Sequence, residues 1–449
     1  MKNWFYIFCW GLFCTAQTHF QSRLLAQVEV RGDLSLLVGT AVNQRLDSPL
    51  NPENLVAMVP DRAVFAEVRP NLQLSFTSLD FVMRPKLEYR FDQFDEELTL
   101  AGKKHQQKNE VRSYWREVYG TWSLGEALQL SWGLQNYQWG PAEAANPSNP
   151  IFRESVLNRS ILYESRGKHL LRIHRKVSEN WQLMAMAETQ EPISDQNYSD
   201  LESANMAMST DFHPQALVRM EYMREAQYVG LVLGSQLNGS RYFGEYASWT
   251  SEDGFSLFFD AVHRQGRLVK SPVSEVGTMV PGSLEEAQDL TLFEEEAKGE
   301  KVMTFAVIGL RYEWQESDFR TEWIEYQEGY SRGEQEQLLV NLRTAGANPF
   351  LAQQLLLQSQ DTGRIYPGRR LYMFSYRKQK PFALQDSTAY LRYLASATDG
   401  SAQAYGHWET AWNDQLVGFL AFGLGVGSKT SEMSGLVASS VLLGLKESW

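Results

Sequence analysis

The clearest indication of fold class lies in residues 79–92, which read Leu79-Asp80-Phe81-Val82-Met83-Arg84-Pro85-Lys86-Leu87-Glu88-Tyr89-Arg90-Phe91-Asp92. Successive side chains of a β-strand point to opposite faces, so odd-numbered residues share one face here and even-numbered residues share the other. The odd-numbered face carries no charge, and the six charges of the stretch all fall on the even-numbered face. The stretch therefore predicts a strand with one apolar face and one ionic face.

Pro85 is the one residue that does not fit a regular strand. Proline has no backbone N–H to donate to a neighbouring strand, so it is confined to edge strands, strand starts and bulges. A closed sheet has no edge strand. If this strand belongs to a closed sheet, we expect a bulge or a strand end at Pro85.

The same alternation recurs less regularly along the chain, often with aromatic residues near the ends of a segment. The recurrences are found at 128–135, 216–222, 255–261, 306–314 and 372–377. Transmembrane β-barrels alternate in this way, with an apolar outer face bounded by aromatic girdles and a polar interior. An Arg or Lys turned toward lipid at the bilayer midplane costs about 2–4 kcal/mol, so the orientation of such strands is strongly fixed.

Short turns and long polar stretches separate the predicted strands. Asn238-Gly239 and His213-Pro214 are typical turn sequences. The long polar stretches are 43–61, 93–109, 140–167, 265–301 and 330–368. Alternation of short turns with long loops is typical of a transmembrane barrel whose long loops lie outside the cell.

A direct count along the chain finds about 19 candidate strands, with the least distinct between residues 181 and 250. Bacterial single-chain barrels have even numbers of strands. We therefore predict an all-β chain whose residues 27–449 form a single transmembrane antiparallel β-barrel of about 18 strands, give or take two, with long extracellular loops. A barrel of 16–18 strands leaves an aqueous channel.

The N-terminal residues 1–26 predict a secretory signal peptide. Lys2 precedes a short apolar run that is too short to span a bilayer comfortably, and cleavage is expected after Ala16 or Ala26. Both cysteines, Cys9 and Cys14, fall inside this segment, so the mature chain would have no disulfide, thiolate metal site or cysteine nucleophile. The predicted location is the outer membrane of a Gram-negative cell.

The C-terminus gives an independent indication. Val441, Leu443, Leu445 and Trp449 share one face of a final strand, although Glu447 departs from the apolar alternation. The pattern resembles the C-terminal strand by which outer-membrane barrels are recognised for assembly. We therefore expect Trp449 to be an assembly signal, and the partners to be outer-membrane lipid, lipopolysaccharide and the barrel assembly machinery.

Composition and motifs exclude several other functions. A net charge of −12 argues against a nucleic-acid partner, because phosphate binding needs a basic face. We find no metal-binding or phosphate-binding motif and predict no metal, cofactor or catalytic residue. Asn238-Gly239-Ser240-Arg241 is similar to a segment of outer-membrane phospholipases, but no histidine stands just before the serine, and a hairpin turn explains Asn-Gly. A soluble propeller would show a repeat of about 40–50 residues, and none is visible.

Charged residues on the polar faces of the predicted strands are the candidates for a pore lining. Such residues filter solutes by the sign of their charge. An alternative role is mutual ion pairing that only braces the wall. The candidates are Arg84, Lys86, Glu88, Arg90, Arg172, His174, Arg219, Glu221, Arg311 and Glu313.

Two loops are candidates for narrowing or closing the pore. Residues 139–153 contain three prolines and form a stiff, turn-rich loop that either folds into the mouth as a constriction or stays on the surface. The stretch 330–368 contains two leucine-rich runs, 338–342 and 351–357, that predict a helical hairpin able to cap or plug the pore. The constriction candidates are Trp139, Glu143, Asn146, Asn149 and Arg153.

The segment 133–153, with Gln138-Trp139-Gly140-Pro141 followed by Asn146-Pro147-Ser148-Asn149-Pro150, resembles a segment of alginate-export-type barrels and related outer-membrane proteins. This resemblance implies a barrel and, as one alternative, export of an anionic polysaccharide. The leading hypothesis is a channel for passive or substrate-selective diffusion of small hydrophilic solutes, without a chemical step. A plugged structural or adhesion barrel and an outer-membrane enzyme remain alternatives from other classes.

Overall fold

The computed structural model describes most of the chain. The described residues are 28–46, 48, 59–100, 103–152, 164–165, 167–190, 214–237, 239–273, 293–294, 301–345, 358, 365–366, 368–431, 433 and 437–449. The predicted signal peptide, residues 1–26, lies outside them, as does the constriction candidate Arg153.

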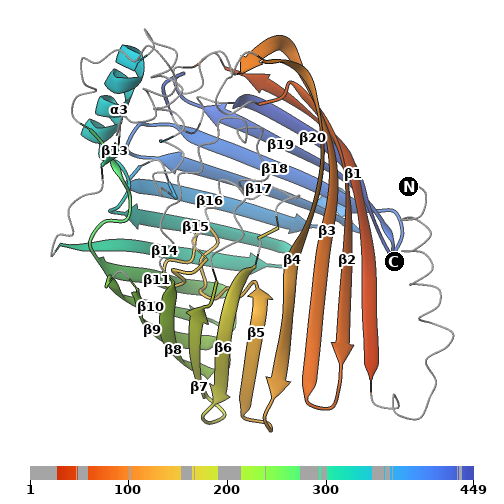
Figure 1. Ribbon diagram of the computed structural model, residues 1–449, viewed down its shortest axis with the longest axis vertical. Coiled ribbons are helices and arrows are strands. Elements are labelled where there is room, and N and C mark those ends of the chain that lie inside the picture. Colours follow the sequence, from red (N-terminus) through yellow and green to blue (C-terminus); the bar gives the residue numbers. More distant parts are fainter. Residues whose placement is uncertain are drawn as a thin grey trace.

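Among the described residues, eighteen strands form one closed antiparallel sheet (Figure 1). Each strand pairs with its neighbours in sequence, and the last strand pairs with the first, which confirms the predicted β-barrel. The barrel strands are β1 (Glu29–Arg45), β2 (Arg62–Ser75), β3 (Leu79–Leu100), β4 (Lys103–Ser123), β5 (Leu128–Gln135), β6 (Lys168–Lys176), β7 (Trp181–Glu188), β8 (Gln215–Arg224), β9 (Gln227–Gln236), β10 (Arg241–Thr250), β11 (Phe255–Gln265), β14 (Val302–Trp314), β15 (Ser317–Tyr326), β16 (Arg370–Gln379), β17 (Ser387–Ser396), β18 (Ala402–Ala411), β19 (Leu416–Val426) and β20 (Val437–Ser448).

Few other elements accompany the barrel. The strands β12 (Ser271–Pro272) and β13 (Phe293–Glu294) pair with each other, η5 (Pro381–Ala383) is a short 3-10 helix, and α3 (Arg332–Ala345) is an α-helix. Helix α3 includes the first of the two leucine-rich runs predicted to be helical, whereas the second, 351–357, lies outside the described residues. No helix in the described part of the chain is long and apolar enough to cross a membrane.

The two rims of the barrel differ in the length of their connections. We call the rim with connections such as 76–78, 225–226 and 315–316 the short-turn rim, and the opposite rim, with connections such as 136–167 and 266–301, the long-loop rim. The chain enters the barrel at the short-turn rim and ends there. This arrangement has the alternation that the sequence predicts.

One predicted turn was wrong. The connection between β7 and β8 covers residues 189–214, so His213-Pro214 is not a tight turn; Pro214 directly precedes β8, where a residue without an N–H is tolerated. The short connection lies instead between β9 and β10, where Gly239 adopts a φ of 92°. The connection 266–301 lies on the long-loop rim with the other long connections.

The prediction of a loop at residues 93–109 was also wrong. Strands β3 and β4 continue through it as a hairpin, pairing as far as Leu100 with Lys103. The last β3 residue that pairs with β2 is Gln93, so the hairpin extends beyond β2 at the long-loop rim (Figure 1). Backbone pairing needs no apolar face, and a polar strand therefore gives no hydrophobic alternation to recognise.

The strand faces are arranged as in a membrane barrel. In β8, Val218 and Met220 on the outer face are 44% and 42% exposed, whereas Arg219 and Glu221 on the inner face are 5% and 8% exposed. An apolar outer face and a polar inner face are the reverse of the order in a soluble protein. Pro85 lies at a register shift between β3 and β4, where the predicted bulge occurs.

Candidate pore constriction

The connection that follows β5 lies inside the barrel. We call residues 136–152 the inner loop. Its residues Ala144, Ser148, Asn149 and Ile151 have no exposed surface. The loop contacts β15, which is separated from β5 by seven strands in one direction around the barrel and nine in the other. The inner loop therefore crosses the lumen to the opposite wall.

Two buried carboxylates hold the inner loop against that wall. The backbone N–H of Ser148 donates to Asp260 Oδ1 on β11 at 2.7 Å. The N–H groups of Glu143 and Ala144 donate to the two carboxylate oxygens of Glu322 on β15, at 2.7 and 2.8 Å. Each of these hydrogen bonds contributes about 1 kcal/mol. Backbone amides that would otherwise be buried without a partner are thereby satisfied.

The tip of the inner loop carries Glu143. Its carboxylate accepts hydrogen bonds from Ser375 Oγ on β16, at 3.1 Å, and from Tyr390 Oη on β17. Arg320 Nε on β15 lies 3.6 Å from the same carboxylate. Tyr366 Oη donates to the carbonyl oxygen of Ala144 at 2.5 Å. Side chains from three strands thus fix the position of one acidic group inside the barrel.

The base of the inner loop is held by arginines. The guanidinium of Arg172 lies 4.2 Å from the centre of the Tyr137 ring, and that of Arg219 lies 5.6 Å from it. Arg219 also lies 5.5 Å from the ring of Trp139. Cation–π contacts of this kind contribute about 0.5–2 kcal/mol, more where water is excluded.

Glycine and asparagine residues shape the inner loop. Gly140 has a φ of +98°, and a Cβ at this position would lie 2.1 Å from Asp260 Oδ2. Asn149 Nδ2 donates to the carbonyl of Tyr137 at 3.1 Å, and the Asn149 N–H donates to the carbonyl of Asn146 at 3.0 Å. Only a residue without a side chain fits at Gly140, and the asparagines close the turns that fold the loop back on itself.

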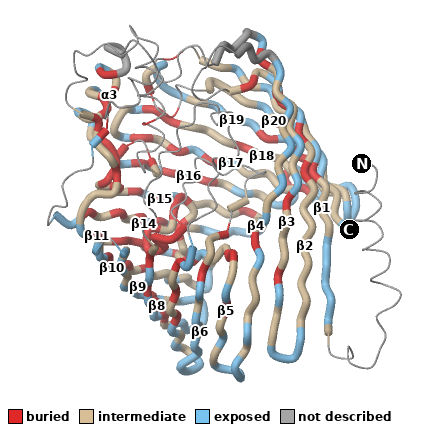
Figure 2. The backbone as a smooth tube through the Cα atoms, in the orientation of Figure 1, coloured by how far each residue is buried: buried red, intermediate tan, exposed pale blue. Residues whose placement is uncertain are grey.

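The inner loop fills one side of the lumen. Its apolar residues belong to a continuous buried cluster with the inner faces of β6–β11 and β14–β17, which we call the filled side. Figure 2 shows buried residues gathered on these strands, whereas β1–β4 are mostly intermediate or exposed. No described residue of β2–β4 belongs to this cluster, and we expect the passage for water and solutes on that side.

Comparison with known proteins shows similarity of fold. No protein-family model and no curated protein matches the sequence. The crystal structure of Acinetobacter baumannii OccAB1 is similar over 94% of this chain and 96% of that chain, with a TM-score of 0.51 and 11% identity. Pseudomonas aeruginosa OccK5 (OpdH) has a TM-score of 0.50, 11% identity and coverage of 94% and 98%. Pseudomonas aeruginosa OccK7 (OpdD) has a TM-score of 0.50, 10% identity and coverage of 94% and 99%.

The chain has the barrel fold of outer-membrane porins. The porin fold confirms the predicted fold class and strand number. At these identities the similarity concerns the fold alone. The resemblance of residues 133–153 to alginate-export-type barrels stays a prediction.

Opposite the filled side, the porin wall carries a ladder of ion pairs. We call the inner faces of β2–β4 the charged side. Lys86 Nζ lies 3.0 Å from Glu67 and 3.4 Å from Glu88, and its side chain is 8% exposed. Four predicted lining residues lie on the charged side on one strand, β3: Arg84, Lys86, Glu88 and Arg90. Most of their ion-pair partners were not predicted. These partners are Glu67 on β2, Asp92 on β3 and Glu117 on β4.

The other predicted lining residues occupy separate places. Arg172 and Arg219 meet at the base of the inner loop, and Glu221 lies beside Arg219 at 3.9 Å. His174 contacts Gln182 at 2.8 Å. Arg311 pairs with Glu313 and Asp318 near the short-turn rim of the porin. The constriction candidates Trp139, Glu143, Asn146 and Asn149 all lie in the inner loop.

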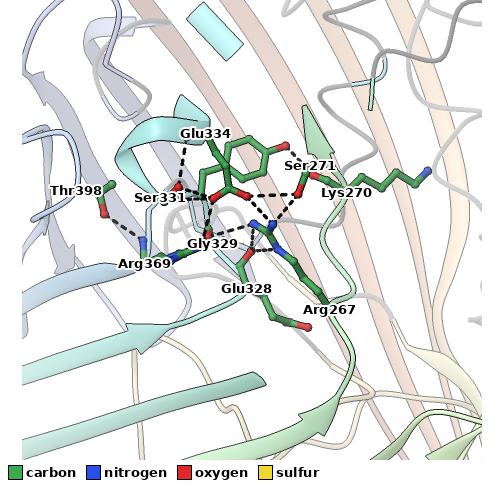
Figure 3. A network of polar contacts seen from close by, with 10 residues as sticks. Arg267, Lys270, Ser271, Glu328, Gly329, Ser331, Glu334, Arg369 and Thr398 are labelled. Carbon is green, nitrogen blue, oxygen red and sulfur yellow. Dashed lines mark hydrogen bonds and ion pairs between the residues drawn. The ribbon is translucent and has the colours of Figure 1, made fainter. Parts of the chain in front are cut away.

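A polar network joins α3 to the long-loop rim (Figure 3). Arg267 donates to the carbonyls of Glu328 and Gly329 and forms an ion pair with Glu334 of α3 at 2.5 Å. Burial acts to raise the pKa of Glu334, but hydrogen bonds from Arg267 and Ser331 outweigh burial and lower the pKa to about 2. Arg369 also contacts Glu334, at 3.3 Å. The ionised carboxylate of Glu334 therefore helps to fix the helix on the long-loop rim of the barrel.

Several residues that hold the porin constriction escaped prediction. Asp260 is the only charged residue in the middle of an otherwise apolar stretch of β11, and Glu322 lies between Thr321 and Trp323 on β15. A single acidic residue at an inner position is a usable signal. The partner of such a residue is a backbone N–H more than 100 positions away in the sequence, and no residue pattern reveals it.

Proposed function

We propose that this chain is an outer-membrane channel for the diffusion of small hydrophilic solutes, exported by an N-terminal signal peptide that is cleaved after Ala16 or Ala26. The observation that carries the proposal is the inner loop, which crosses the lumen to the opposite wall and, among the described residues, leaves the inner faces of β2–β4 outside the buried cluster. A structural barrel with no transport function would have no need of a charged wall facing water. The porin fold and the apolar outer face support location in the outer membrane of a Gram-negative cell.

The passage in this proposal lies between the inner loop and the charged side. The lining candidates there bear both signs, and Arg84, Lys86 and Arg90 each contact a carboxylate. Paired charges give a polar wall with little net field, which suits solutes of either sign or none. Export of an anionic polysaccharide would need an excess of unpaired positive charge along the path.

Assembly in the proposed location would involve the C-terminal residue. The Trp449 N–H donates to the carbonyl of Leu34 at 2.9 Å, and the Trp449 carbonyl accepts from the Leu34 N–H at 3.1 Å. The side chain of Trp449 stays on the surface, 51% exposed. We infer that Trp449 is read by the assembly machinery and also closes the seam between β1 and β20.

Single-channel recording in planar lipid bilayers tests the proposal. The purified protein is expected to produce stable conductance steps with weak preference between potassium and chloride. Insertion without any steps, verified by protease protection of the inserted barrel, would contradict a channel and favour the plugged barrel. A strong preference for anions would favour the polysaccharide exporter.

A further inference from the structure

Three aromatic side chains form a cluster on the inner wall beside the tip of the inner loop. Tyr390 on β17 and His407 on β18 stack with ring centres 5.1 Å apart and an interplanar angle of 28°. Tyr405 lies next along β18, with its ring centre 5.9 Å from that of His407. The hydrogen bond from Tyr390 to Glu143 places the cluster at the level of the constriction.

The cluster lies outside the packed core of the filled side. All three rings are partly exposed, and none of them belongs to the buried apolar cluster. On the next strand, Gly423 pairs with Tyr405, and a Cβ built at Gly423 would meet only Ser440 Oγ within 4 Å. At other inner glycines, such as Gly230 and Gly309, an aromatic ring already occupies the equivalent space. Among the described residues, no aromatic ring occupies this space at Gly423.

Polar groups surround this aromatic surface. The carboxylate of Glu143 lies at one edge, already contacted by Arg320 and Tyr390. The guanidinium of Arg392 lies 4.9 Å from the centre of the Tyr405 ring. A cationic ligand would have to displace Arg320 or Tyr390 from the Glu143 carboxylate. A hydroxyl group can donate to the carboxylate or accept from the guanidinium while both partners stay in place.

We propose that Tyr390, Tyr405 and His407, together with Glu143 and Arg392, form a binding subsite for a neutral pyranose sugar. One face of a pyranose ring is largely C–H groups, which bury apolar area against an aromatic surface, and its hydroxyls project at the edges. The proposal rests on the channel function proposed above. Binding in a channel must be weak, because a solute held tightly would not leave.

Maltotriose is the probe, tested on the full-length folded barrel. Added to open channels, it is expected to interrupt the ion current reversibly. Tyr405→Ala is expected to weaken this block about tenfold, whereas Tyr405→Phe, which keeps the ring, stays within about twofold of the parent. Gly423→Val fills the open space while leaving the rings intact and is expected to weaken the block as well. Tyr119→Ala, an inward-facing tyrosine on β4, is the matched control and leaves the block unchanged.

Equilibrium dialysis of maltotriose against the folded protein in detergent gives a second measurement that needs no conductance. Sugar binding with silent bilayers would count against the channel and in favour of the subsite. Open channels that maltotriose neither enters nor blocks, with no binding in dialysis, would overturn the subsite alone. Equal block in Tyr405→Ala and the parent, or much stronger block by glucuronate or glucosamine than by maltotriose, would also overturn it.

Discussion

The filled side and the charged side enclose the same lumen but are stabilised differently. On the filled side, inner residues such as Leu170, Val232 and Val307 have no exposed surface, because the inner loop covers them. On the charged side, inner residues pair with each other through charges, and the side chains of Arg84 and Arg90 are 35% and 37% exposed. An 18-stranded barrel is too wide for wall side chains to fill. One side therefore receives a core from a loop, and the other is braced by ion pairs.

Removing the inner loop should have the largest effect on the difference between the filled side and the charged side. Replacing residues 140–150 with a short Gly-Ser linker should raise the single-channel conductance several-fold, because the segment that crosses the lumen is gone. A difference in migration between the unheated and the heated protein in detergent gels checks that the barrel still forms. A milder variant, Asp260→Asn with Glu322→Gln, keeps the loop but removes the charged acceptors and should add open-channel noise. Unchanged conductance in the deletion variant would show that the loop does not narrow the path.

Loss of one member of the ionic ladder should destabilise the charged side. In Lys86→Met, Glu67 and Glu88 lose a common partner inside the wall, although Glu67 keeps its contact with Arg69. Breaking a buried ion pair should lower the free energy of unfolding by about 3 kcal/mol, which urea unfolding in lipid vesicles would measure. The control Arg31→Met removes an exposed pair with Glu29, and its cost should stay below about 1 kcal/mol. Equal effects of the two variants would mean that the ladder does not brace the wall.

Acid should loosen α3 before it affects the barrel. The pKa of Glu334 is lowered to about 2, so the stabilisation from its ionised form is complete above the ordinary value of 4.5 and is lost as the pH falls toward 2. Hydrogen exchange in α3 should accelerate over this range while the strands stay protected. In Glu334→Gln, fast exchange should already be present at neutral pH. A helix that stays protected at pH 2 in the parent protein would contradict the expected role of Glu334.

Much of the fold was predictable from sequence because a membrane imposes a strict two-residue period on each strand. Residues 79–92 show this period, and the structure has the predicted strand and bulge there. The incorrect predictions concern segments on which the membrane does not impose this two-residue period. Residues 93–109 pair beyond β2, and residues 189–214 connect two strands, so neither segment carries the alternation.

The site was less predictable because its contacts are long-range. Trp139 and Glu143 were identified from the rigidity of their loop, but their partners Arg219, Glu322 and Tyr390 come from strands spread along the chain. Local sequence shows that a loop is stiff. It does not show which wall the loop will meet, since that depends on the closure of the whole barrel.

Cysteine accessibility tests the central claim most directly. Single cysteines are placed on the charged side as Arg90→Cys and on the filled side as Val307→Cys, in a chain without Cys9 and Cys14, the only two cysteines of the sequence. A charged, membrane-impermeant thiol reagent is expected to react at position 90 and change the conductance, while position 307 stays unreactive in the folded barrel. Similar reaction rates at both positions would contradict a lumen filled on one side and open on the other.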